Sequence, residues 1–403
     1  MSEYDVIVVG GGPGGSTAAR RAALKGLSVL LLDKETFPRI KPCGGGMNPT
    51  VEQTLDFSIE EVVHRRPHGF RMFSPSGLVV DGSQSQTSGI LVMRSEFDHL
   101  LLRKAEEAGV EVLEGQRVIG AEQDSRGVSV LTKGGGIHTG SYLIGADGIN
   151  STVAKSLGFY QGWPKDSAAV TIEIEAEVGK EAVERICGVP DKKGSVTFDI
   201  YLGAVQFGYG WCFPKKTILS MGLGGRQDKI RNLRGTFDKW FDEFKKKHEI
   251  DPEILSDTAA RVPYSGAAPR TAFGRTLLVG DAAGFVNPFD QEGAVMAIQS
   301  GVIAATIVEQ AVQTSNAQVL RGYERAWKDE FGDVLKVGKN IAKMLFKNEK
   351  NMEIICQMGA KDQVIRDIMF KLIETQEPYT SLYRALIKRI LAKHPRAGLS
   401  LYI

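Results

Sequence analysis

The 403-residue chain is predicted to be an α/β protein with an inserted β-sheet region and a helical C-terminal region. Three observations predict this class. An apolar strand leads into a glycine-rich turn and a helix near the N-terminus, and a second strand followed by glycine appears at residues 275–281. Between them, residues 167–225 show successive strand patterns, at 168–176, 194–201, 206–213 and 217–223, separated by turn residues. Beyond about residue 319 the apolar residues recur almost wholly at helical spacing.

The composition is that of an ordinary globular protein. Hydrophobic residues make up 42%, charged residues 24%, and the net charge is +2. These values argue against disorder and against a general nucleic-acid-binding surface. The cysteines are too widely spaced for a disulfide framework or a zinc site, so we expect no metal. There is no secretory signal pattern and no apolar run long enough to cross a bilayer. We therefore expect a cytoplasmic protein that is soluble or peripheral to the membrane.

The first element is a βαβ unit with a nucleotide-binding turn. Strands are expected at 4–9 and 28–32, with a helix at about 16–25. Residues 10–15, Gly-Gly-Gly-Pro-Gly-Gly, satisfy the G-x-G-x-x-G pattern in that context. Gly10 permits the tight turn, Gly12 lets a pyrophosphate approach, and Gly15 lets helix and strand pack closely. Asp33 ends the second strand and is placed to bind a ribose, which predicts a Rossmann-type fold. The further candidates of this unit are Pro13, Gly14 and Lys34.

A helix from Ser95 to Gly109, capped by Ser95, is expected next, followed by strands near 111–117 and 128–133. The triplet 134–136, Gly-Gly-Gly, lies between two strand patterns. We interpret it as a hairpin turn and not as a second nucleotide loop.

Two later motifs distinguish between dinucleotides. Residues 145–151, Gly-Ala-Asp-Gly-Ile-Asn-Ser, and 280–288, Gly-Asp-Ala-Ala-Gly-Phe-Val-Asn-Pro, resemble flavin motifs of the p-hydroxybenzoate hydroxylase-type family. That family contains aromatic hydroxylases, flavin halogenases and geranylgeranyl reductases. The resemblance implies that FAD is the cofactor and that Asp281 binds its ribityl chain. It also implies that a helix starting near Gly293 and Ala294 points its positive end at the flavin ring, which suits reduced flavin. The remaining flavin candidates are Arg94 for the diphosphate, Val118 for the adenine, and Asp147, Gly148 and Pro288.

Two further motifs point to one branch of this family. Residues 38–46 resemble the P-x-x-x-x-C-G-G-G element of geranylgeranyl reductases, and residues 209–214, Tyr-Gly-Trp-Cys-Phe-Pro, resemble their Y-x-W-x-F-P motif. The resemblance covers residues 1 to about 310. It implies that reduced FAD gives a hydride from N5 to a C=C bond of an isoprenoid lipid or a prenylated quinone, while a proton completes the other carbon.

Several residues of these motifs are candidates for the chemistry. Gly44, Gly45 and Gly46 would let a loop lie against the flavin ring. Cys43 is the first candidate for the proton donor, although a free cysteine is often a small buried hydrophobe. Tyr209 is the second acid candidate. Its ring, with those of Trp211 and Phe213, would line an apolar channel for the lipid, or would form part of a β-sheet core. Asp147 either contacts FAD or supports the fold.

The sequence departs from the family pattern in two places. Gln291 stands where a glycine usually leads the G-E-G-I element, and Ala154 replaces a frequent basic residue, although Lys155 follows it. We expect a discontinuous FAD-binding domain at 1–165 and 262–318, with part of 50–95 facing the substrate. A β-sheet substrate domain is expected at 166–261, and a helical region at 319–403.

The helical region carries a possible contact surface. Residues 336, 339, 343, 347 and 350 are all lysines and would form a basic stripe on one helix. Either the helices are solvated, or this stripe contacts a membrane surface. The chain has no second dinucleotide motif, so electrons would come from ferredoxin, from another small carrier or from NAD(P)H. The rival functions are a flavin monooxygenase or halogenase, and a non-catalytic electron-transfer flavoprotein.

Overall fold

The first sheet of the computed structural model surrounds the N-terminal strand. The structure describes residues 3–82, 87–190, 192–374 and 377–402. Five parallel strands run in the order β20-β11-β1-β2-β8. Their bounds are β1 Tyr4–Val9, β2 Val29–Leu32, β8 Glu111–Leu113, β11 Ile137–Gly145 and β20 Thr276–Leu278. Antiparallel strands extend this sheet: β9 Val118–Gln123, β10 Val128–Thr132 and β19 Ala272–Phe273. The turn at 134–136 joins β10 to β11, as expected.

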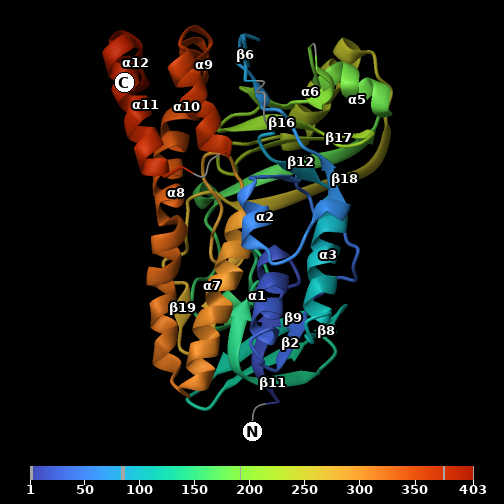
Figure 1. Ribbon diagram of the computed structural model, residues 1–403, viewed down its shortest axis with the longest axis vertical. Coiled ribbons are helices and arrows are strands. Elements are labelled where there is room, and N and C mark those ends of the chain that lie inside the picture. The colour runs from blue at the N-terminus through green and yellow to red at the C-terminus, as the bar shows by residue number, and fades with distance from the viewer. Residues whose placement is uncertain (1–2, 83–86, 191, 375–376, 403) are drawn as a thin grey trace.

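Three helices cover this sheet side by side: α1 (Pro13–Ala23), α3 (Arg94–Glu106) and α7 (Ala294–Gln313) (Figure 1). A Cβ atom on Gly301 of α7 would lie 2.5 Å from the Gly14 carbonyl oxygen of α1, so small residues let these helices approach closely. By length and composition α7 could cross a membrane, but 56% of its apolar stretch is buried inside the molecule. In this fold α7 is a core helix. The helix expected to be capped by Ser95 begins one residue earlier, at Arg94, without a side-chain cap.

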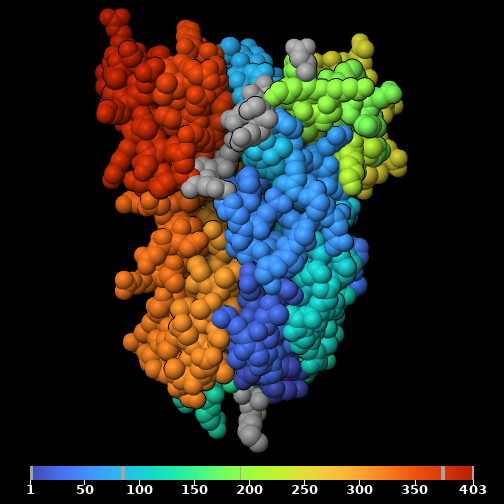
Figure 2. All heavy atoms as spheres, viewed as in Figure 1, coloured from blue at the N-terminus to red at the C-terminus, as the bar shows by residue number. Residues whose placement is uncertain are grey.

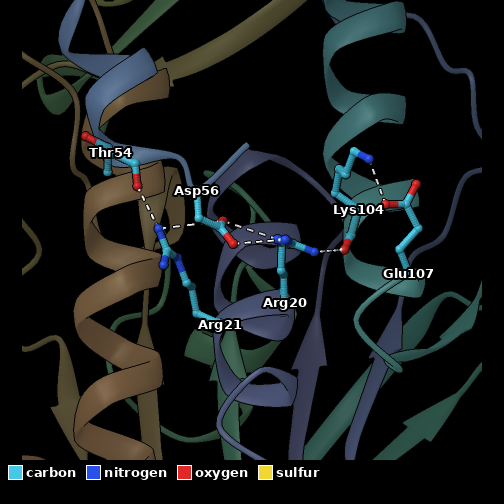
Figure 3. Close-up of polar contacts among 6 residues, drawn as sticks. All are labelled: Arg20, Arg21, Thr54, Asp56, Lys104 and Glu107. Atoms are coloured by element: carbon cyan, nitrogen blue, oxygen red, sulfur yellow. Dashed lines mark hydrogen bonds and ion pairs between the residues drawn. The ribbon is translucent and has the colours of Figure 1, made fainter. Parts of the chain in front are cut away.

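Two arginines of α1 tie the helix to its neighbours. Arg20 donates to Asp56 and to the Lys104 carbonyl oxygen of α3, at 2.9 and 2.6 Å (Figure 3). Arg21 donates to the Thr54 carbonyl oxygen at 2.9 Å. Thr54 ends α2 (Thr50–Thr54), so these contacts fix the segment that follows the glycine loop at 44–46.

The second sheet is almost wholly antiparallel, in the order β18-β12-β17-β16-β15-β5-β6, with only β15 and β5 parallel. Its strands are β5 Phe70–Phe73, β6 Val79–Asp81, β12 Ala168–Glu177, β15 Phe198–Leu202, β16 Gly208–Pro214, β17 Ile218–Arg226 and β18 Glu253–Pro263. Helices α5 (Lys180–Cys187) and α6 (Leu233–His248) cover one face. The single strand expected at 194–201 is wrong. The structure has two strands there, because β14 (Lys192–Val196) pairs with β13 (Gly188–Val189) outside the sheet.

Short elements connect the sheets. A three-stranded sheet consists of β3 Gly46–Met47, β4 Val63–Arg65 and β7 Ile90–Val92. The remaining short helices are α4 Thr152–Ser156, η1 Glu60–Val62, η2 Lys165–Ser167, η3 Gly280–Ala282 and η4 Ala317–Gly322. The division of the chain into domains stays a prediction.

Five helices form the C-terminal region: α8 Tyr323–Leu345, α9 Glu349–Lys361, α10 Gln363–Glu374, α11 Tyr379–Lys393 and α12 Pro395–Tyr402. Helices α9 to α12 form a lobe at the end of the molecule that also holds α5 and α6 (Figures 1 and 2). Phe370 of α10 packs on Phe70 of the second sheet, with ring centroids 4.1 Å apart. The lysine stripe on one helix is wrong, because α8 ends at Leu345, Lys347 follows it and Lys350 lies in α9.

Candidate functional site

A cavity of about 1060 Å³ lies between the two sheets. On one side it is lined by residues at the carboxyl ends of parallel strands, Val9, Leu32 and Val279. This is where open α/β sheets bind ligands. On the other side it is lined by 170–172 of β12 and 259–262 of β18. The predicted residues that line it are Gly10, Gly12, Pro13, Gly14, Asp33, Lys34, Cys43, Arg94, Val118, Asp147, Gly148, Asp281, Gly293 and Ala294.

The glycine turn has the geometry that a bound phosphate needs. Gly10 adopts φ +108°, and a Cβ there would lie 2.3 Å from the Ala146 carbonyl oxygen. A Cβ on Gly15 would lie 1.8 Å from the Gly10 carbonyl oxygen, so Gly15 lines no cavity and serves helix–strand packing. Next to Gly12 the space is open, and among the described residues the nearest side-chain atom to its Cβ position is a guanidinium nitrogen of Arg39, at 3.7 Å. The start of α1 thus presents its backbone N–H groups to the cavity.

Asp33 is buried at the edge of the same cavity. Its Oδ2 accepts a hydrogen bond from the Gly11 N–H at 2.6 Å, and its Oδ1 accepts one from the Glu35 N–H at 2.8 Å. Each carboxylate oxygen keeps a second acceptor site. The carboxylate is therefore held rigidly by the glycine turn and still suits ribose hydroxyl groups.

Two arginines give one wall of the cavity a positive charge. Arg94 donates from Nε and Nη2 to Asp98 at 2.8 and 2.9 Å, and Arg39 lies 3.0 Å from the same carboxylate. Burial opposes the charge of Arg94, but Asp98 and Cys43 hold its pKa above the ordinary value. Two guanidinium groups share one carboxylate, which leaves positive charge for a diphosphate. Arg39 and Asp98 were not predicted from the sequence, although the spacing of Arg94 and Asp98 at i,i+4 is a recognisable signal.

Asp147 stabilises the local backbone at the start of α4. It accepts hydrogen bonds from the Ser151 hydroxyl and from the N–H groups of Thr152 and Val153, at 2.5 to 3.1 Å. Burial raises the pKa of Asp147. The carboxylate fixes the start of α4, while its neighbour Gly148, at φ +77°, leaves open space beside the cavity.

The start of α7 also lines the cavity. Gly293 and Ala294 line it, and Glu292 accepts a hydrogen bond from the Val295 N–H at 2.9 Å. Burial raises the pKa of Glu292 to about 7 and that of the neighbouring Asp290 to about 8. Pro288 does not line the cavity, and its carbonyl oxygen accepts from Gln291 at 3.0 Å.

Cys43 lines the cavity where the loop 43–46 crosses to the second sheet. Its N–H donates to Glu173 Oε2 of β12 at 2.6 Å, and its Sγ accepts from the Gly45 N–H at 3.4 Å. Gly45 adopts φ +70° and lies against the Val92 carbonyl oxygen. The loop is therefore held between β7 and β12, with the thiol on the cavity side.

The aromatic residues of β16 lie behind this loop and do not line the cavity. A Cβ on Gly44 would meet the Phe213 ring at 2.6 Å and Trp211 Nε1 at 2.9 Å, and a Cβ on Gly46 would meet Phe213 at 3.0 Å. The Tyr209 hydroxyl donates to the Asp290 carbonyl oxygen. Burial raises the pKa of Tyr209. Its ring stacks on Phe346, at the C-terminal helices.

These residues fit an extended dinucleotide. The open space at Gly12, the unbalanced guanidinium charge and the starts of α1 and α7 suit the diphosphate and flavin ring of FAD. The fold and site define a flavoprotein of the oxidoreductase class. The chain belongs to the family described as the FAD binding domain, whose profile matches residues 3–330. Its cofactor is FAD.

Named relatives cover most of the chain. The digeranylgeranylglycerophospholipid reductase of Methanocaldococcus jannaschii is 30% identical over 85% of this chain and 87% of its own length. The menaquinone reductase of Mycobacterium tuberculosis is 30% identical over 85% and 84%. A geranylgeranyl bacteriochlorophyll reductase-like protein of Thermoplasma acidophilum superimposes with a TM-score of 0.82 at 23% identity, over 99% and 98% of the two chains. Flavin-dependent halogenases share the fold at lower TM-scores, such as 0.66.

Proposed function

We propose that the protein is an FAD-dependent reductase that saturates C=C bonds of isoprenoid chains. The observation that carries this proposal is the loop 43–46, which places the Cys43 thiol on the cavity wall and packs its glycines on the aromatic strand β16. Relatives at 30% identity are named as reductases of a digeranylgeranyl lipid and of menaquinone, so an isoprenoid lipid or a prenylated quinone is the substrate class.

Bound FAD, once reduced, supplies the hydride. The residues of the chain hold the cofactor and supply the proton. The α1 start with Arg39 and Arg94 would hold the diphosphate, and Asp33 would hold the ribose. Asp281 would hold the ribityl chain, and the α7 start would orient the ring. An alkene has no carbonyl to polarise, so a positioned acid and a water-free site must lower the barrier.

Of the two acid candidates, Cys43 has the better geometry. The Tyr209 hydroxyl is committed to the Asp290 carbonyl oxygen, and its raised pKa makes the phenol a weaker acid. Cys43 lies in the cavity wall beside the guanidinium of Arg94. The rings of Tyr209, which stacks on Phe346 after α8, and of Phe213 are half-buried and retain apolar surface that suits contact with the lipid chain.

The C-terminal helices are the proposed contact with the membrane. Leu391 of α11 and Leu399 of α12 are 57% and 63% exposed, and Lys388 and Lys393 are exposed on the same helix α11. Exposed apolar side chains among lysines suit the surface of an anionic bilayer. The protein then works at the cytoplasmic face, and receives electrons from ferredoxin or NAD(P)H.

A spectroscopic assay tests the function. The holoenzyme is reduced with dithionite without oxygen, and the return of oxidised flavin absorbance is followed after adding a geranylgeranyl glycerolipid, menaquinone or an aromatic substrate. Reoxidation by the prenyl compounds alone supports the reductase. If only oxygen with the aromatic substrate reoxidises the flavin, the protein is a monooxygenase. If no prenyl compound does, the reductase proposal fails.

A further inference from the structure

A buried cluster of three charged side chains lies behind the Cys43 loop. Glu173 and Glu175 project from the same face of β12 and are 2% and 9% exposed, while Lys215 is 0% exposed. Buried charges of this kind are rare unless they are paired. None of the three lines the cavity, yet Glu173 and Lys215 are hydrogen-bonded to the loop that does.

The cluster is bonded directly to the loop. Glu173 accepts from the Cys43 N–H at 2.6 Å and from the Ser220 hydroxyl at 2.7 Å. Lys215 Nζ donates to the Gly44 carbonyl oxygen and lies 2.9 Å from the Cβ position of Gly45. Glu173 and Glu175 are two residues apart on the same face of β12, so their carboxyl groups influence each other's pKa. The Oε2 atom of Glu175 is buried and has no partner among the described residues.

The charges favour one proton shared by the carboxyl pair. Two carboxylates beside one ammonium would leave a buried negative charge, whereas a protonated Glu175 leaves the cluster neutral. Burial and the neighbouring Glu173 raise the pKa of Glu175 to about 8, although Lys215 opposes the shift. Burial lowers the pKa of Lys215. The other titratable groups that face this cluster are Cys43 and Cys212.

We propose that the Glu173–Glu175 pair stores the proton that replaces the one given by Cys43 during alkene reduction, and that Lys215 carries it between them. This inference rests on the proposed function. The electron pair comes from reduced FAD as a hydride to one alkene carbon. The S–H bond of Cys43 breaks and a C–H bond forms at the other carbon. Lys215 then gives a proton to the thiolate and takes one from Glu175, and the carboxyl pair is reprotonated from solvent.

The pH dependence of Cys43 alkylation tests this inference without any lipid. Cys43 is partly exposed, whereas Cys187, Cys212 and Cys356 are buried, and a Cys43→Ser variant gives the background. The iodoacetamide rate of the oxidised holoenzyme should show an additional inflection near pH 8, where Glu175 ionises. Glu175→Gln should remove this inflection. Glu177→Gln, the same change two residues along β12, should keep it.

A second variant, Ser220→Ala, keeps the inference testable if Glu175→Gln does not fold. Ser220→Ala removes only the hydroxyl that stabilises the Glu173 carboxylate, so the inflection should move to higher pH. An inflection unchanged in both Glu175→Gln and Ser220→Ala overturns the proton store. In single-turnover reoxidation with lipid, Glu175→Gln should slow the step at least about tenfold, while Glu177→Gln stays within about twofold. If the wild type reduces no lipid but the alkylation profile holds, the proposed function fails and the cluster's coupling to Cys43 stands.

Discussion

At the residue scale, Gln291 occupies a backbone conformation that L side chains rarely adopt. Its φ is +60°, where the resembling family usually has glycine. The side chain compensates in part, because Nε2 donates to the Pro288 carbonyl oxygen at 3.0 Å. Its Oε1 is buried without a partner among the described residues, and the residue lines the cavity. The replacement of the usual glycine by Gln291 therefore places a larger side chain at the cavity on a left-handed backbone.

Two substitutions of Gln291 separate the effect of its side-chain hydrogen bond from the effect of its left-handed backbone. Gln291→Ala keeps the left-handed strain and loses the amide contact, whereas Gln291→Gly loses the contact and the strain. We expect the glycine variant to have a free energy of unfolding about 1 kcal/mol higher than the alanine variant. Urea unfolding of both holoenzymes measures the difference. Equal stability, or a more stable alanine variant, would show that the backbone relaxes at this position.

Arg94 is the second residue whose role can be tested by substitution. Arg94→Gln removes one of the two guanidinium groups that share Asp98, so FAD affinity should fall at least about tenfold. Titration of the FAD-free protein, followed by flavin fluorescence, measures the affinity. Arg103→Gln, on an exposed part of the same helix, is the control. An unchanged affinity in Arg94→Gln would place the diphosphate elsewhere.

At the scale of elements, ion pairs join the C-terminal helices. Asp362 accepts hydrogen bonds from the N–H groups of Val364 and Ile365 at the start of α10. It also pairs with Arg389 of α11 at 2.8 Å and with His394 at 3.3 Å. Hydrogen bonds from Arg389, partly opposed by desolvation, lower the pKa of Asp362 to about 2. This carboxylate therefore ties α10 to α11, and α11 carries part of the proposed membrane contact.

The sign of its pH dependence follows from that lowered pKa. Asp362 contributes stability above the unfolded-state pKa, near 4, and loses it as the pH falls toward 2. Asp362→Asn keeps a capping oxygen but not the charge, so it should lower the free energy of unfolding by about 1 kcal/mol at pH 7. The difference from wild type should close between about pH 5 and pH 2. Urea unfolding across this range measures it. A difference that does not depend on pH would contradict the charge assignment.

Elements with a strong local pattern were predicted well. The βαβ unit and the hairpin at 134–136 depend on short-range periodicity and turn chemistry, which one sequence contains. The split of 194–201 was missed because its cause is the pairing of β14 with β13, which tertiary structure decides. The regular spacing of the lysines continues past Leu345, although helix α8 ends there. Asn348 caps the next helix, α9. The sequence shows two charged residues, Glu173 and Glu175, within an apolar strand. Only the tertiary fold, however, brings Lys215 close to them.

At the scale of the whole molecule, the C-terminal helices are part of the core of the second sheet. Phe70, Met72 and Val80 of that sheet share one apolar cluster with residues of α8 to α11. The tip of the Phe370 ring lies only 1.5 Å from where a Cβ on Gly82 would be. The lobe formed by α9 to α12 can therefore pack against the sheet because Gly82, which follows strand β6, has no side chain. The sequence indicated helices there, but gave no sign of the surface on which they pack.

This contact can be tested with a single methyl group. Gly82→Ala forces the buried Phe370 ring to move and should lower the free energy of unfolding by about 1 to 3 kcal/mol. It should also make the C-terminal helices more sensitive to limited proteolysis. Gly134→Ala is the matched control, since nothing lies within 4 Å of its Cβ position. Identical unfolding of the two variants would show that the lobe does not depend on this contact.

Mass spectrometry of the lipid after anaerobic incubation with the reduced holoenzyme tests the reductase function. A geranylgeranyl glycerolipid should gain two hydrogen atoms for each reduced flavin consumed, and Cys43→Ser should retain FAD but lose most of this activity. A lipid that stays unchanged while the flavin stays reduced, for both the glycerolipid and menaquinone, would contradict it.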